Sequence, residues 1–306
     1  MNARIPMTKF VLEWITESLA TLYGIKEVIY SGETRYQKVD IVRTYDFGLV
    51  LLLDGLMQSA EFDEYIYHEL LVHPSMITHP NPRRVLIIGG GEGATAREVE
   101  RHPAVEEIHM ADLDGELIEI AKKYLPWSRD GFKDPRLKLY IEEGRSFLSR
   151  QPDNFYDVII MDATDPAEGS LAVKLYTKEF YSLAYRKLKT DGLIATHAAP
   201  ILLKTDLSMS IFKTMNSIFP RVCIYASYIK SLEGMWSFIV GSKEALPQDL
   251  SGEEVDERIR QRGVSGLKFY SGKVHRAIFE LTEAYLKNFI SRGEIFLDER
   301  FSKTRI

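Results

Sequence analysis

In Val85-Leu86-Ile87-Ile88-Gly89-Gly90-Gly91-Glu92-Gly93-Ala94, an apolar run of four residues enters a glycine-rich turn. A second apolar run ends at Ala111-Asp112-Leu113-Asp114. A strand that feeds a glycine turn at a helix start lets backbone approach a nucleotide, and an acidic side chain about 20 residues later can bind the ribose hydroxyls. The pattern predicts an adenosine-type ligand at Gly89, Gly91 and Asp112. The alternative is a tight strand-to-helix turn without a ligand. The acidic residue after the next strand argues against this alternative.

Glu92 is a carboxylate inside the glycine turn, where a pyrophosphate would have to sit near the helix N-terminus. Because like charges repel, this residue argues against a nicotinamide-dependent oxidoreductase. The loop instead indicates a cationic ligand. A methyltransferase that uses intact S-adenosylmethionine shares the strand-glycine-acid layout and is the main alternative, but it needs a place for the methionine carboxylate, which Glu92 obstructs.

The composition indicates a globular protein with small-molecule partners. A chain of 306 residues, 45% hydrophobic, can form one main domain and a smaller one. With 39 Lys+Arg against 44 Asp+Glu, no nucleic-acid partner is expected, and small cations are mildly favoured. Cys223 is the only cysteine, which excludes an internal disulfide and fits a cytoplasmic location. No membrane-spanning stretch is expected.

The pattern of residues divides the chain near residue 80. Residues 24–58 alternate and are rich in Val, Ile, Tyr and Thr, which predicts a small antiparallel sheet. Residues 63–76 are predicted to form a helix that ends before the breaker His79-Pro80-Asn81-Pro82. We therefore expect an N-terminal β-hairpin domain with its linking helix at 1–80, and a Rossmann-like catalytic domain with a C-terminal helical tail at 81–306.

Seven strand-like runs alternate with helical segments in the second part. They are Val85–Ile88, Ile108–Leu113, Leu137–Ile141, Asp157–Met161, Leu193–Thr196, Val222–Tyr228 and Phe238–Val240. This alternation predicts an α/β fold with a seven-stranded, doubly wound, methyltransferase-like sheet that is covered on both faces. Ligands of such sheets bind beyond the carboxyl ends of the strands.

Two carboxylates follow the strand-like run Tyr156-Asp157-Val158-Ile159-Ile160-Met161-Asp162, because Asp165 comes three residues after Asp162. Two carboxylates on one short loop repel each other, so the arrangement is costly unless it binds cations. A turn aspartate and a helix cap are the alternative explanation. Together with Glu92 and Glu143 at neighbouring strand ends, the two aspartates exceed what capping requires.

Several motifs in order resemble the polyamine aminopropyltransferase family, of the spermidine synthase and thermospermine synthase type. The motifs are Tyr36-Gln37, Leu53-Asp54-Gly55-Leu56-Met57-Gln58, Asp63-Glu64-Tyr65-Ile66-Tyr67-His68-Glu69, Val72-His73-Pro74, the glycine turn with Arg97-Glu98-Val99, and Asp162 to Pro166, with weaker matches at Phe269-Tyr270 and His275 to Phe279.

The resemblance implies an enzyme that moves an aminopropyl group from decarboxylated S-adenosylmethionine, its co-substrate, to an amine and releases 5'-methylthioadenosine. It implies a base, Asp162, aided by Tyr67. The implied donor-binding residues are Gln37, Gln58, Gly89, Gly91, Glu92, Asp112 for the ribose, and Glu143 with Gly144 for the adenine edge. The implied acceptor-binding residues are His68, Glu92, Asp162 and Asp165. Without the resemblance, Tyr67 would be interpreted as a core aromatic residue, and Gln37 and Gln58 as sheet-surface amides. Neither a metal nor a prosthetic group is expected.

Three features depart from the spermidine synthase pattern. Glu92 replaces the usual aspartate, Ala167-Glu168-Gly169 replaces a common Gly-Pro, and Ser231 stands where many putrescine-using members have a tyrosine. The first two are closer to the thermospermine type. Putrescine, agmatine, cadaverine and spermidine all stay open as acceptors. Glu168 and Glu233 either bind a longer polyamine or are surface charges.

The resemblance also implies a homodimer or homotetramer formed through the small sheet. A non-catalytic polyamine-binding module is a further alternative for the function.

Overall fold

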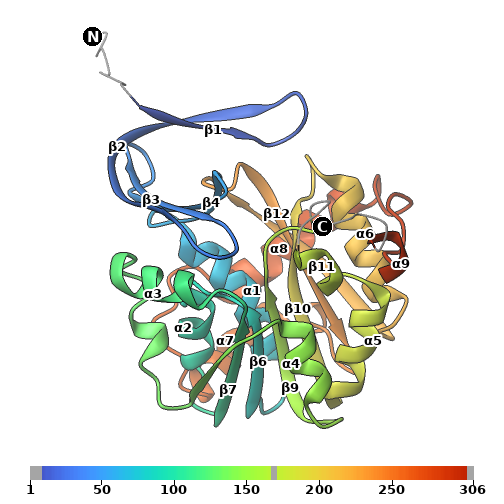
Figure 1. Ribbon diagram of the computed structural model, residues 1–306. Helices are drawn as coiled ribbons and strands as arrows, with labels where there is room; N and C mark the ends of the chain where they lie inside the picture. Colours follow the sequence, from blue (N-terminus) through green and yellow to red (C-terminus); the bar gives the residue numbers. More distant parts are fainter. Residues whose placement is uncertain (1–8, 167–170, 302–306) are drawn as a thin grey trace.

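The computed structural model describes residues 9–166 and 171–301. Its first part is a five-stranded antiparallel sheet in chain order, which confirms the expected small sheet (Figure 1). The strands are β1 (Phe10–Trp14), β2 (Ala20–Glu33), β3 (Lys38–Thr44), β4 (Leu49–Leu53) and β5 (Leu56–Ala60). Asp54 and Gly55 join β4 to β5 with φ angles of 50° and 80°, as a two-residue type I′ turn requires.

The second part is built on a seven-stranded sheet, as the sequence predicts. Its strands are β6 (Arg84–Gly89), β7 (Glu107–Asp112), β8 (Leu137–Ile141), β9 (Tyr156–Asp162), β10 (Leu188–Pro200), β11 (Arg221–Ile229) and β12 (Gly234–Ser242). They lie in the order β11-β12-β10-β9-β6-β7-β8. The neighbours from β10 to β8 pair in parallel, whereas β12 is antiparallel to both β10 and β11.

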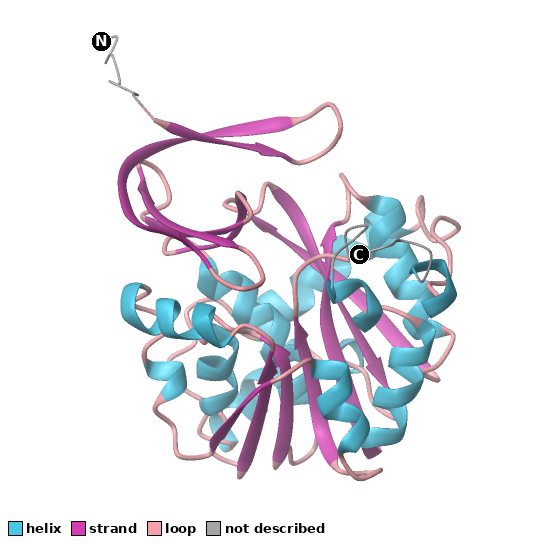
Figure 2. Cartoon of the chain, in the orientation of Figure 1, coloured by secondary structure: helices cyan, strands magenta, loops and turns pink. Residues whose placement is uncertain are grey.

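Helices cover both faces of this sheet (Figure 2). The helices are α1 (Glu64–Thr78), α2 (Ala94–Glu100), α3 (Gly115–Tyr124), α4 (Gly144–Arg150), α5 (Lys178–Lys187), α6 (Thr205–Asn216), α7 (Gly252–Gln261), α8 (Gly272–Leu286) and α9 (Asp298–Phe301). In β6, Val85 and Ile87 pack on the side of α1, α2, α7 and α8, while Leu86 and Ile88 pack on the side of α4, α5 and α6. A strand buried on both faces has to be apolar throughout, which explains its continuous apolar run.

Helix α1 connects the two sheets but packs with the larger one. It contacts α2, β9 and β10, and it contributes Leu70 and Leu71 to the core that also contains Ile87. By packing, α1, which the sequence analysis groups with the small sheet as a linking helix, lies against the large sheet. The small sheet packs against the larger domain through two apolar clusters. Val39 and Ile41 share one cluster with α3, and other residues of β3, β4 and β5 belong to the core around α1.

Among the residues that the structure describes, no helix combines the length and the apolar character needed to cross a bilayer.

Candidate active site

The site is centred where the carboxyl ends of β6 and β9 lie side by side, because Gly89 pairs with Asp162 across the sheet. The chain runs outward from β6 to β7 and β8, then returns to the other side of β6 with β9, so this is the switch point at which such sheets bind ligands. Gly89 has a φ of 80°, and a Cβ there would lie 2.3 Å from the carbonyl oxygen of Asp162. A Cβ on Gly91 would lie 2.8 Å from Asp112 Oδ2. Only glycine lets the turn come this close to both aspartates.

Each carboxylate oxygen of Asp162 accepts a hydrogen bond from a hydroxyl. Tyr67 in α1 donates to Oδ1 at 2.9 Å, and Thr95 in α2 donates to Oδ2 at 2.6 Å. Burial and the charge of Asp162 hold the pKa of Tyr67 well above its ordinary value, so the tyrosine stays a donor. These two bonds fix the direction in which Asp162 faces and leave its remaining lone pairs for a ligand.

Glu92 ends a buried chain of alternating charges. Arg97 binds both carboxylate oxygens of Glu64 at 3.0 and 2.8 Å, Glu64 Oε2 lies 3.0 Å from His68 Nδ1, and His68 Nε2 lies 2.7 Å from Glu92 Oε1. Ser59 Oγ from the small sheet donates to Glu92 Oε2. Burial disfavours a charged His68, but the charges and hydrogen bonds of Glu92 and Glu64 outweigh it and hold its pKa well above its ordinary value. The raised pKa favours the imidazolium form of His68, which places a positive charge beside the Glu92 carboxylate.

The sequence analysis expects His68 to bind the acceptor amine, but this geometry does not place it to do so. Its side chain is only 2% exposed, and both ring nitrogens face carboxylates. Neither nitrogen is left to accept a hydrogen bond from an amine. By geometry, His68 lies behind Glu92 and supports it.

The expected nucleoside-binding residues gather along the ends of β7 and β8. Burial raises the pKa of Asp112 to about 6, although hydrogen bonds from the backbone of Asp114 and Gly91 lower it. Gln37 reaches the same area from the small sheet, because its Nε2 donates to Asp114 Oδ2 at 2.9 Å. The Glu143 carboxylate caps α4 by accepting from the backbone of Arg145 and Ser146.

Gly144 and Gln58 complete the expected set. A Cβ on Gly144 would lie 2.3 Å from Ile88 Cγ2, so this position at the start of α4 needs glycine for packing. Gln58 lies in β5, and its Nε2 donates to the carbonyl oxygen of Leu56 at 3.2 Å.

Sequence reasoning missed the hydroxyls that hold the two key carboxylates. Ser59 follows Gln58 directly, and Thr95 comes three residues after Glu92, so both lie next to motifs already recognised. Nothing in their spacing indicates a contact with Glu92 or Asp162. Asp165 is in place beside the site, where His197 and Lys204 flank it. Residues Ala167, Glu168 and Gly169 lie outside the described residues.

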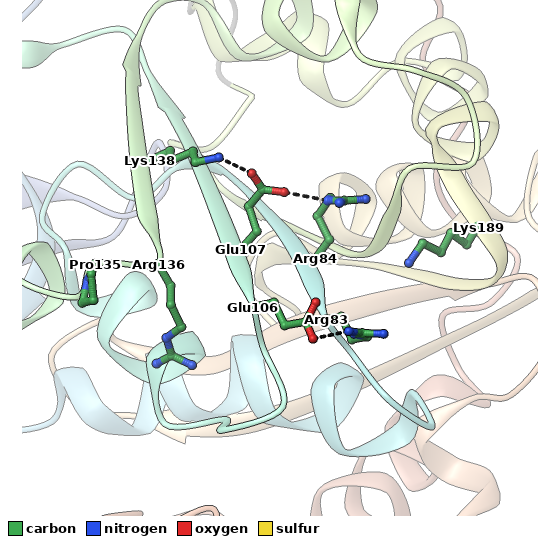
Figure 3. Close-up of a pocket in the computed structure, with 8 residues that line it drawn as sticks. All are labelled: Arg83, Arg84, Glu106, Glu107, Pro135, Arg136, Lys138 and Lys189. Carbon is green, nitrogen blue, oxygen red and sulfur yellow. Dashed lines mark hydrogen bonds and ion pairs between the residues drawn. The ribbon is translucent and has the colours of Figure 1, made fainter.

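A second hollow lies at the opposite, amino ends of the strands (Figure 3). Its cations are already paired: Arg83 with Glu106, and both Arg84 and Lys138 with Glu107. Arg136 and Lys189, which also line it, pair with Asp134 and Asp157, so each cation of this hollow has an ion-pair partner and we interpret it as a surface network of ion pairs.

Among the described residues, one group has a metal-like arrangement, namely His79, Asp157 and Asp191. His79 Nδ1 accepts a hydrogen bond from the backbone of Asn81, so the hydrogen of the neutral ring is on Nε2, which faces the two aspartates. The Lys189 ammonium already lies 2.7 Å from Asp157 Oδ1. A nitrogen that carries hydrogen cannot ligate a metal, so we interpret the group as a structural cluster of polar side chains around the Lys189–Asp157 ion pair.

Comparisons with known proteins agree with this geometry. Residues 64–250 match the model of the spermine/spermidine synthase domain, and residues 12–61 match the spermidine synthase tetramerisation domain. The chain is 43% identical to polyamine aminopropyltransferase 1 of Hyperthermus butylicus over 267 residues, 86% of this chain and 91% of that protein. It is 38% identical to the polyamine aminopropyltransferase of Pyrobaculum aerophilum over 282 residues, 91% of this chain and 97% of that protein.

Two solved structures of similar fold are spermidine synthases. One is a complex with the transition-state analogue AdoDATO, with a TM-score of 0.86, 34% identity, and coverage of 93% of this chain and 95% of that one. The other, from Thermotoga maritima, has a TM-score of 0.84 and 35% identity, and covers 92% of this chain and 94% of that one. The chain therefore belongs to the spermidine synthase family of polyamine aminopropyltransferases.

Proposed function

We propose that this protein transfers an aminopropyl group from decarboxylated S-adenosylmethionine to an aliphatic amine and releases 5'-methylthioadenosine. The observation that carries the proposal is the placement of Asp162 beside the glycine turn, with both of its oxygens held by Tyr67 and Thr95. Family membership and the names of the relatives support the same reaction class.

The donor binds along the glycine turn in this proposal. Asp112 accepts from the ribose hydroxyls, with Gln37 and Gln58 at the nucleoside, and the start of α4 at Glu143 and Gly144 receives the adenine edge. Glu92 attracts the ammonium and the sulfonium of the decarboxylated donor. Intact S-adenosylmethionine carries an additional carboxylate, which Glu92 repels, so the same charge selects for one donor and against the other.

Asp162 acts on the acceptor amine. Alkyl ammonium groups have a pKa near ~10, as lysine does, so the attacking nitrogen has to lose a proton. The neutral nitrogen then forms a bond to the carbon beside sulfur, the carbon–sulfur bond breaks, and its electron pair stays on sulfur as a neutral thioether. Asp162 accepts the proton, and the hydroxyls of Tyr67 and Thr95 keep it aligned for this role. Asp165 holds a second nitrogen of the acceptor.

Replacing Asp162 tests this function. Asp162→Asn keeps the size of the side chain and removes the basic charge; its amide oxygen accepts from one of the two hydroxyls and its NH2 group donates to the other. We expect methylthioadenosine release to fall by about 10²- to 10⁴-fold with a melting temperature close to that of the parent. The matched control is Asp153→Asn, an acid paired with Lys187 away from the site, which should retain the parent rate. Activity of Asp162→Asn within twofold of the parent would refute the role of Asp162 as a base.

A further inference from the structure

Asp165, the proposed ligand of the acceptor's second nitrogen, already lies between two basic side chains. Lys204 Nζ is 3.3 Å from Asp165 Oδ2, and His197 Nδ1 is 3.5 Å from Asp165 Oδ1. Lys204 comes from the N-cap of α6, so a separate segment of the chain brings its charge to this carboxylate.

The histidine does not satisfy Asp165 in its neutral form. His197 is 3% exposed, and its Nε2 lies 2.5 Å from the carbonyl oxygen of Ala163, a group that can only accept. Because the Ala163 carbonyl can only accept, Nε2 carries a hydrogen, and Tyr176 Oη lies 3.1 Å from the same nitrogen. Both His197 Nδ1 and Asp165 Oδ1 are buried without a hydrogen-bond partner among the described residues. Asp165 Oδ1 is therefore the oxygen that remains for an amine donor.

Lys204 holds the other oxygen of Asp165, and its charge also acts on the buried Glu13. Burial raises the pKa of Glu13 to about 7, with Glu233 adding to that shift and Lys204 opposing it, so both charges act on Glu13. Glu233 Oε1 accepts from Tyr23 in β2 at 3.0 Å. The Lys204 side chain is 37% exposed on a flexible stem, so its ammonium can move away from Asp165.

Resting on the proposed function, we propose that Lys204 determines acceptor specificity by competing with the acceptor's second ammonium for Asp165. Two ammonium groups on one carboxylate repel each other, so Lys204 on Asp165 Oδ2 opposes the binding of the second nitrogen of a diamine at Oδ1, and the repulsion falls when Lys204 moves away from Asp165. A monoamine has no second charge and does not compete. The competition therefore weakens diamine binding selectively, and its strength is tuned by one side chain outside the family motifs.

A diamine and a monoamine of equal length, butane-1,4-diamine and butylamine, isolate this effect. We expect Lys204→Met to lower the KM for the diamine by about three- to tenfold and to leave that for the monoamine unchanged, because a partly exposed ion pair is worth this much. Lys204→Arg keeps the charge and should behave as the parent. Lys287→Met, which removes a matched lysine–glutamate pair on α8, is the surface control. An unchanged or raised KM for the diamine, or an equal fall for both amines, would overturn the proposal.

A double-mutant cycle and a binding measurement separate this proposal from the function on which it rests. In an Asp165→Asn background, Lys204→Met should have no further effect on the diamine, and an equal gain there would contradict competition at Asp165. Calorimetric titration of the same diamine into protein with 5'-methylthioadenosine needs no turnover. If Lys204→Met does not lower this Kd, the proposal for Lys204 is wrong, even if the protein transfers an aminopropyl group. If no transfer occurs from any donor, the proposed function is wrong, and the proposal for Lys204 is judged by the Kd alone. If Lys204→Met lowers the melting temperature, Lys204→Gln repeats the test.

Discussion

At the scale of single residues, the site depends on carboxylates that are oriented by hydrogen bonds and ion pairs with their neighbours. Glu92 lies in a turn that would otherwise suit a phosphate, and the positive charge of the His68 imidazolium lies beside it. This arrangement gives the turn a preference for cations. If Glu92 binds the donor as we propose, a change at His68 acts on the donor through Glu92.

Neutralising Glu92 should weaken discrimination between donors. In Glu92→Gln, the preference for decarboxylated over intact S-adenosylmethionine in competitive binding should fall by about tenfold, because one charge contact worth about 1.4 kcal/mol is lost. Glu142→Gln is the control, since this acid at the end of β8 pairs with Arg150. A preference in Glu92→Gln equal to that of the parent would count against the role of Glu92.

The raised pKa of Asp112 predicts a pH dependence of nucleoside binding. Burial raises this pKa to about 6, so Asp112 is ionised above that pH and protonated below it. Because ribose hydroxyls donate to the ionised form, the affinity for 5'-methylthioadenosine should fall as the pH drops below about 6. Calorimetry between pH 5 and 8 measures this, with Asp112→Asn expected to give a flat profile. A flat profile for the parent would show that Asp112 does not receive the ribose.

At the scale of helices and strands, apolar patterning predicts the larger sheet well. All seven strand-like runs are strands, because a strand such as β6 is buried on both faces and must be apolar along its length. The pattern does not show where α1 packs, since this helix is joined to the small sheet in sequence but packs on α2 and β10. It also misses β1, whose apolar residues face outward, so that burial does not shape its pattern.

The same limit applies to the site. The glycines and aspartates could be found because a close backbone approach and a strand end each leave a local signature. The contacts of Thr95 and Ser59 could not, since a hydroxyl near a helix start or in a strand is common and its partner is set by tertiary packing. For His68, the motif gave the position but not the two carboxylates around it.

The buried cluster around α2 predicts acid sensitivity of the fold. Burial raises the pKa of Glu98, but His73, Arg97 and Arg101 lower it more and bring it to about 2. Because this is below the ordinary value of 4.5, the stabilisation is complete above about pH 4.5 and is lost as the pH falls toward 2, by up to about 3 kcal/mol. The melting temperature should therefore fall more steeply between pH 5 and 2 in the parent than in Glu98→Gln. Parallel curves would refute this assignment.

At the scale of the whole molecule, the β1–β2 hairpin presents an apolar surface. Phe10, Leu12 and Trp14 are 56%, 51% and 60% exposed, and Leu22, opposite Leu12 on β2, is 48% exposed. Exposed apolar patches of this kind mark contacts with other chains. The hairpin lies on the far side of the small sheet from the large domain, so a partner can approach it (Figure 1).

We expect this hairpin to join copies of the chain. The double variant Leu12→Glu and Trp14→Glu should shift the mass in light scattering to that of a monomer. Assembly would bury two unpaired charges in the contact, which is unfavourable. Leu281→Glu, at an isolated exposed leucine of α8, should leave the assembly unchanged. An unaltered mass in the double variant would place the contact elsewhere.

The central claim is that the carboxylates at the ends of β6 and β9 recognise a decarboxylated donor and deprotonate an amine. Mass spectrometry of the products formed by the unmodified protein tests it most directly. With decarboxylated S-adenosylmethionine, the account predicts an amine that is heavier by one aminopropyl unit and an equal amount of 5'-methylthioadenosine. Methylated product and S-adenosylhomocysteine from the intact donor would contradict it.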